Sequence, residues 1–89
     1  MKITSVNYSL SPNTSHEFGE FDAMYNYIVS VARATTGFSY VAICCAENML
    51  TTLVSNENIT ATINNRHITV TNNTSNSVYV DIVKLGGAH

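Results

Sequence analysis

The clearest hydrophobic pattern in the chain lies between residues 17 and 35. Apolar residues recur there at steps of three and four: Phe18, Phe21, Tyr25, Ile28, Val29 and Ala32. This spacing places them on one face of an α-helix. Thr14 and Glu17 fit a capping box at its start, and Gly37 fits a left-handed cap at its end. The pattern predicts one long amphipathic helix over residues 17–35.

The second half of the chain follows a different period. Residues 59–63 and 67–71 alternate apolar and polar side chains, and Asn64-Asn65 between them suits a two-residue turn. Residues 78–85 form a further strongly β-branched segment. These segments predict a hairpin followed by a final strand.

Three other segments favour strands. Residues 2–10 carry Val6, Tyr8 and Leu10 on one alternation, and residues 38–46 are apolar on both alternations, as in a strand buried on both faces. Residues 46–54 fit either a helix or a strand. We favour the strand because alternating segments follow it.

The predicted fold is therefore an α+β single domain over residues 1–89. One long helix packs on an antiparallel β-meander of about five strands, in the order β-α-β-β-β-β-(β). Tyr25 and Ile28 are expected at the centre of the contact between helix and sheet. The order of the strands within the sheet stays open.

Composition limits the kinds of partner. Charged residues make up 11% of the chain, against roughly 25% in an average protein, and 31 of the 89 residues are Ser, Thr or Asn. Four basic residues cannot form the phosphate-binding stripe that a nucleic-acid partner requires. The first ten residues lack the apolar run of a signal peptide, and no segment has the length of a membrane span. We therefore expect a cytoplasmic protein that binds neither nucleic acid nor membrane.

No constellation of residues indicates catalysis. Cys44 and Cys45 are adjacent in a strand, point to opposite faces and suit small buried apolar positions better than a disulfide. The pattern His16-Glu17-x-x-Glu20 lacks the second histidine of the zinc-protease motif. A nucleophile elbow and a glycine-rich phosphate loop are also missing from the sequence. We predict no catalytic residue, no metal site and no cofactor.

The remaining hypothesis is action by contact. We predict a small non-catalytic protein-binding module, in one form an inhibitor of a host protein complex of the kind that phages and mobile elements encode. The first alternative is a self-associating structural or scaffold subunit, and the second is a thiol-dependent enzyme that uses Cys44 or Cys45. One helix covers only one face of a sheet, so the other face should carry an apolar strip for a protein partner or a homodimer. The predicted interface residues are Tyr79, Val83, Tyr40 and Leu85.

Overall fold

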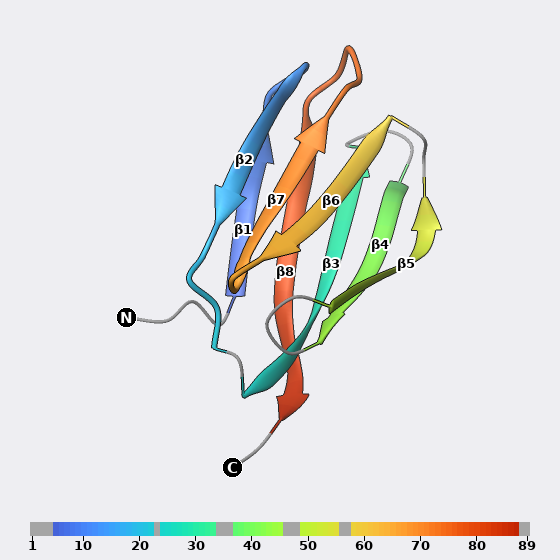
Figure 1. Cartoon of the computed structure of the whole chain (residues 1–89). Coiled ribbons are helices and arrows are strands. Elements are labelled where there is room, and N and C mark those ends of the chain that lie inside the picture. The colour runs from blue at the N-terminus through green and yellow to red at the C-terminus, as the bar shows by residue number, and fades with distance from the viewer. Residues whose placement is uncertain (1–4, 23, 34–36, 46–48, 56–57, 88–89) are drawn as a thin grey trace.

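The computed structural model of the chain describes residues 5–22, 24–33, 37–45, 49–55 and 58–87. Within these ranges the chain forms eight strands, which make two antiparallel sheets packed face to face (Figure 1). The larger sheet has the strand order β1-β8-β3-β4-β5, and the smaller sheet has the order β2-β7-β6. The strands are β1 (Ser5–Leu10), β2 (Thr14–Phe18), β3 (Tyr25–Arg33), β4 (Gly37–Cys45), β5 (Met49–Ser55), β6 (Ile59–Asn64), β7 (His67–Asn72) and β8 (Val78–Gly87).

The predicted helix is wrong, and with it the α+β fold class, because the described part of the chain contains strands and no helix. The described residues of the segment 17–35 hold the end of β2, a connection and strand β3, while residues 23 and 34–36 lie outside the described ranges. The cause is visible in β3, where Tyr27, Val29 and Val31 are buried at every second position. Aromatic and β-branched side chains of this kind fit a pleated surface. The spacing of three and four therefore mixed residues from two faces of a strand.

Tyr25 and Ile28 consequently do not form the centre of a helix–sheet contact. Ile28 is half-buried on the face of the larger sheet that points away from the smaller sheet. Tyr25 is half-buried at the start of β3, where the Lys84 ammonium lies 4.2 Å from the centre of its ring. Val29 and Val31, which are fully buried, occupy the position that the helix prediction gave to Ile28.

The strands predicted in the rest of the chain are confirmed where the structure describes them, although their arrangement is only partly a meander. The ambiguous segment 46–54 forms a strand from Met49, while residues 46–48 and 2–4 lie outside the described ranges. The turn between β6 and β7 falls one residue later than predicted, at Asn65 and Arg66. Both have positive φ angles, 49° and 64°, as a two-residue hairpin turn of type I′ requires.

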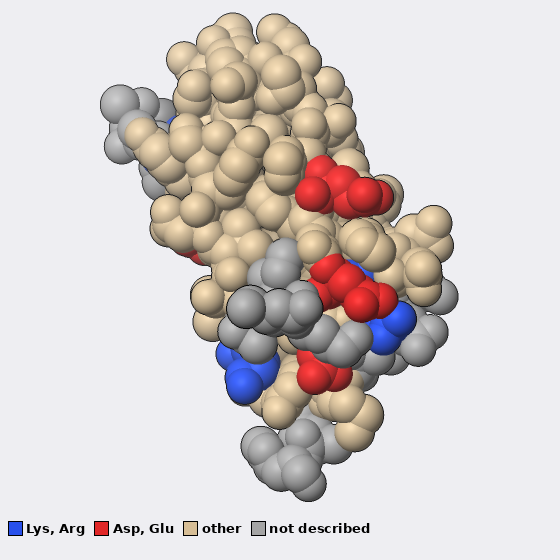
Figure 2. Space-filling model, turned by 90° about the vertical axis from the view of Figure 1, so that its left-hand side faces the viewer, with Lys and Arg blue, Asp and Glu red and all other residues tan. Residues whose placement is uncertain are grey.

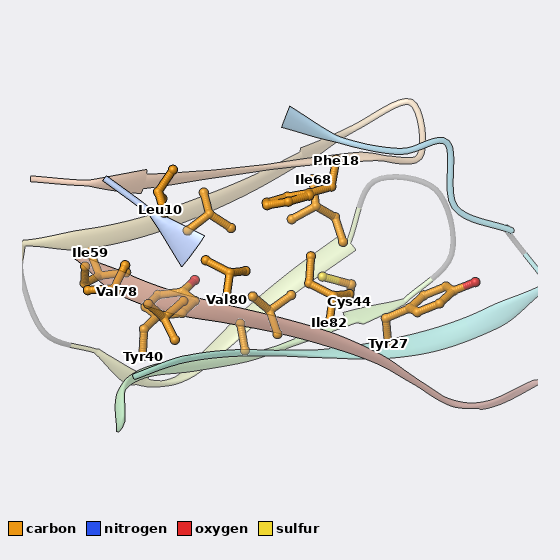
Figure 3. Close-up of a cluster of buried hydrophobic side chains, with 14 of the residues drawn as sticks. Leu10, Phe18, Tyr27, Tyr40, Cys44, Ile59, Ile68, Val78, Val80 and Ile82 are labelled. Carbon is orange, nitrogen blue, oxygen red and sulfur yellow. The ribbon is translucent and has the colours of Figure 1, made fainter. Parts of the chain in front are cut away.

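The core lies between the two sheets, as Figure 3 shows. Alternate residues from Val78 to Ile82 in β8 and from Tyr27 to Val31 in β3 point inward from the larger sheet, and the inward side chains of β2, β6 and β7 meet them from the smaller sheet. The fully buried residues include Val29, Val31, Ile59, Ile68, Val70, Val78, Val80 and Ile82. Burial of these branched side chains against one another is the main favourable term for a sandwich of this size.

The first two strands pair with the last two in both layers. Strand β1 lies beside β8 in the larger sheet, and β2 lies beside β7 in the smaller sheet. Of the predicted meander, the neighbours β4–β5 and β6–β7 are paired in the structure, whereas β5 does not pair with β6 and β7 does not pair with β8. The long-range pairs place β8 near the centre of the larger sheet, between β1 and β3.

One buried amide ties the two layers together at the end of the molecule where β1 ends. Asn72, the last residue of β7, is fully buried, and its Nδ2 donates hydrogen bonds to the carbonyl oxygens of Leu10 (3.3 Å), Ser11 (3.2 Å) and Asn76 (2.9 Å). Its Oδ1 accepts from the backbone N–H of Thr74 (3.0 Å) and from the Thr74 hydroxyl (2.7 Å). Asn72 therefore fixes the end of β1 and the connection between β7 and β8 at once.

Candidate functional site

Three of the four predicted interface residues are exposed on β8. Tyr79, Val83 and Leu85 have exposed fractions of 46%, 47% and 56%. The alternate residues of this strand, Val78, Val80 and Ile82, point into the core and are buried. Tyr79 and Val83 therefore point away from the smaller sheet, while Leu85 lies at the irregularity where β8 shifts register against β3. We call the face of the larger sheet that points away from the smaller sheet the outer face.

An apolar row crosses three strands of the outer face. Val83 of β8 lies directly opposite Ile28 of β3, and Ile28 lies opposite Ile43 of β4. Directly paired side chains on neighbouring strands are in contact range. Val83 is exposed, and Ile28 and Ile43 are half-buried. We call these three residues the outer row. No other element among the described residues packs over it.

A polar row separates Tyr79 from the outer row. Asp81 lies between Val83 and Tyr79 on the same face of β8, and the Asn7 side-chain amide of β1 donates a hydrogen bond of 2.6 Å to its carboxylate. The neighbour of Asp81 on β3 is Ser30. The strip predicted around Tyr79 and Val83 is therefore interrupted, and Val83 rather than Tyr79 belongs to the continuous apolar part.

Tyr40 does not lie on this surface. Its exposed fraction is 2%, and its hydroxyl is 2.8 Å from the Thr52 hydroxyl oxygen, on the side of the larger sheet that faces the core. The sequence could not assign Tyr40 to a face because residues 38–46 are apolar on both alternations. The structure assigns Val41 and Ile43 to the outer face instead, because Ile43 pairs with Ile28.

Two residues of the outer row were missed as site residues. The helical spacing places Ile28 in the predicted helix, and the sequence does not distinguish Ile43 from its neighbours. The signal that could have found Ile28 is the alternation of Tyr27, Val29 and Val31 around it, which has a period of two. Ile43 carries no such local signal.

The two cysteines occupy different environments, and both are free thiols. Cys44 has an exposed fraction of 1% and points into the core, whereas Cys45 is half-buried. Burial raises the pKa of the Cys44 thiol to about 11, with a smaller contribution from the neighbouring Cys45. A thiol with this pKa carries very little thiolate at neutral pH, and thiolate is the reactive form.

Raising the pH from 9 to 11 is expected to destabilise the fold through Cys44. The unfolded thiol has its ordinary pKa of 9.0 and the folded thiol a pKa of about 11, so over this range the folded chain keeps a proton that the unfolded chain loses. The stabilisation is complete below pH 9 and falls as the pH rises to 11. Urea unfolding should show a smaller loss of unfolding free energy over this pH range in Cys44→Ala, which lacks the thiol. Some loss remains in the variant because burial also raises the pKa of Tyr27, and this contribution is the same in both proteins. Equal losses in the two proteins would contradict this assignment.

The motif His16-Glu17-x-x-Glu20 does not form a cluster. His16 and Glu17 are adjacent in β2, so their side chains point to opposite faces, and the His16 ring stacks on Tyr8 with 4.4 Å between ring centres. The Glu20 carboxylate forms an ion pair of 2.5 Å with Arg66 in the turn between β6 and β7. Within the described ranges, no three side chains of His, Cys, Asp or Glu lie close enough together to hold a metal ion.

Charged side chains are distributed unevenly over the surface. Figure 2 shows the side of the molecule formed by β1 and β2, where most of the Asp, Glu, Lys and Arg side chains in view lie in the lower half. The opposite, upper part of this side is almost entirely uncharged. The residues of β4 and β5 carry no charge at all. Contact with another protein surface would therefore require little desolvation of charged groups on these strands.

No protein-family model matches the sequence, and neither the curated proteins nor the solved structures include a significant match. The described residues include no helix of the length and apolar character that crossing a membrane requires.

Proposed function

We propose that this protein is a non-catalytic protein-binding module whose docking surface is centred on the outer row. The observation that carries the proposal is the direct pairing of Val83, Ile28 and Ile43 across three strands, on a sheet face with no described element packed over it. Contiguous apolar surface of this kind usually marks an interaction site. Inhibition of a larger protein complex is one form that such binding takes.

The position of polar groups supports this choice of surface. Asp81 and Ser30 border the outer row on one side, so the apolar centre has a polar margin. Protein interfaces commonly combine an apolar centre with a polar rim. We also propose a cytoplasmic location, because two free cysteines in so short a chain suit a reducing compartment.

Substituting Val83 by lysine should remove partner binding while the fold is kept. A lysine ammonium in the middle of an apolar interface must lose its hydration without an acid to pair with. The immobilised protein is used to capture its partner from a lysate of the cells that produce it, and Val83→Lys is compared with Thr62→Lys. Thr62 is exposed on the smaller sheet, so the same substitution there serves as a matched control.

A single protein retained by wild type and Thr62→Lys but lost by Val83→Lys is the expected result. Equal retention by all three proteins would show that the outer row is not the docking surface. Thermal unfolding of Val83→Lys within a few degrees of wild type confirms that the fold is intact, because Val83 is already half exposed.

A self-associating structural subunit is the second candidate, and it is favoured by the uncharged edge of β5. A thiol-dependent enzyme that uses Cys44 is disfavoured, because Cys44 is buried and its thiol has a pKa of about 11. Such a thiol lacks both the access and the thiolate that nucleophilic catalysis requires.

A further inference from the structure

We propose that β5 pairs edge to edge with β5 of a second copy of this chain, an inference that rests on the self-association candidate and is independent of the outer row. β5 is the last strand of the larger sheet, and no strand among the described residues pairs with its far side. An unpaired edge presents backbone N–H and C=O groups that can hydrogen-bond to a further strand. The larger sheet therefore ends in a surface suited to strand addition.

β5 lacks most of the features that keep edge strands apart. Monomeric proteins commonly protect such edges with charged residues, proline or a bulge. The segment Met49–Ser55 contains no charged residue and no proline. Its one protective feature is the register shift against β4 near Leu53, between the pair Val41–Val54 and the pair Ala42–Thr52. The regular part of β5, from Met49 to Thr52, stays available for pairing.

Exposed apolar side chains distinguish β5 from the other three edge strands. Met49, Leu53 and Val54 have exposed fractions of 66%, 56% and 44%. β6 exposes only polar residues, β2 carries Glu17, and the one large apolar residue exposed on β1 is Tyr8, which stacks on His16. Pairing through β5 therefore removes more apolar surface from water than pairing through any other edge.

The absence of charge also favours a second copy over an unrelated strand. In a two-fold antiparallel pair, residues near the axis lie opposite the same residues of the other copy. A charged residue there would face its own equivalent, and like charges on paired strands are destabilising. β5 contains none, so its sequence is compatible with itself.

The expected dimer is weak and depends on concentration. Seven residues of extended strand span roughly 23 Å, and the edge of a sandwich is about 10 Å thick. This contact is smaller than the roughly 800 Å² per partner of a standard interface. A two-fold axis perpendicular to the sheet would join the two larger sheets into one and place both outer rows on the same face, where they remain accessible.

The test uses opposite charges at Thr51, which is exposed in the regular part of β5. Sedimentation equilibrium of the wild-type chain should show a dimer fraction that rises with concentration. Thr51→Lys and Thr51→Glu should each be monomeric, and an equimolar mixture should recover the dimer because lysine and glutamate then meet near the axis. Ser15→Lys, a matched change on the edge strand β2, should dimerise like wild type.

Three results would overturn the proposal: a wild-type monomer at millimolar concentration, dimers of either Thr51 variant alone, or a mixture that stays monomeric. If the Thr51 variants do not fold, hydrogen exchange of the wild type decides, because the β5 amides must become more protected as its concentration rises. Thr51 lies opposite Ile43 of the outer row, so the docking surface is tested separately with Val83→Lys, which lies on β8 and should dimerise like wild type. Failure of the dimer is therefore distinct from failure of the docking surface.

Discussion

Truncating Ile82 to alanine is expected to lower the free energy of unfolding by about 2–5 kcal/mol. Ile82 is fully buried near the middle of β8, which itself lies near the centre of the larger sheet. Its side chain points toward the smaller sheet in Figure 3. The substitution removes buried apolar carbon atoms and leaves a cavity between the two sheets. The sheets cannot move closer to fill this cavity, because the surrounding side chains are close-packed. Urea unfolding followed by far-UV circular dichroism measures the change.

Ile28→Ala is the matched control. The two-sheet structure and the predicted helix give opposite expectations for which of the two isoleucines matters more for stability. Ile28→Ala should cost less than about 1.5 kcal/mol, since the side chain is half-buried on the outer face and the site has no second layer above it. A helix packed on a sheet through Ile28 predicts the reverse order. An Ile28→Ala variant less stable than Ile82→Ala would therefore contradict the structure.

Replacing Asn72 by alanine is expected to cost about 3 kcal/mol. The change removes the donor to three carbonyl oxygens and the acceptor for Thr74, and these groups belong to the ends of two different sheets. Each buried polar group left without a partner costs about 1–3 kcal/mol, although relaxation and water entry offset part of the sum. The melting temperature and the urea midpoint should both fall.

The neighbouring Asn73 is the matched control for Asn72. Its side chain is exposed, and Asn73→Ala should change stability by less than about 0.5 kcal/mol. Asn72→Asp keeps the size of the side chain and removes the donors, so it should be at least as damaging as Asn72→Ala. If Asn72→Asp were as stable as wild type, the hydrogen bonds between the layers would not be what stabilises this end.

The strands with local signals could be predicted from the sequence. The alternation in β6 and β7 identified both strands and, within one residue, the turn between them. The helix error arose because Phe18, Phe21, Tyr25 and Ile28 match a helical spacing although they belong to β2, a connection and β3. Gly19 lies in that connection with a φ of 153°, a conformation that a helix does not contain. In so short a segment, the spacing of apolar residues alone does not distinguish the period of a helix from the period of a strand.

The arrangement of the strands could not be predicted in the same way. The pairs β1–β8 and β2–β7 join residues from opposite ends of the chain, and no local pattern specifies such partners. The residues of the candidate site could not be predicted for the same reason. Val83 on β8 and Ile43 on β4 lie near each other only because β3 pairs with both of these strands. The sequence predicts Tyr40 at the interface although it is buried, because a strand that is apolar on both alternations does not reveal which face is inward.

The pairing of the first strands with the last has a consequence for how the protein forms during synthesis. β1 ends at Leu10 and its partner β8 begins at Val78, so β1 leaves the ribosome well before its partner exists. At about 5–20 residues per second, translation of the intervening chain takes roughly 3–14 seconds. During this interval β3, β4 and β5 can pair with one another, and β7 can pair with β6 and β2 once it emerges. The edges of β1 and β3 that β8 later occupies stay open until the end. A nascent chain so poor in charge is expected to depend on ribosome-bound chaperones until β8 emerges, and stalled chains that lack β8 should be protease-sensitive throughout.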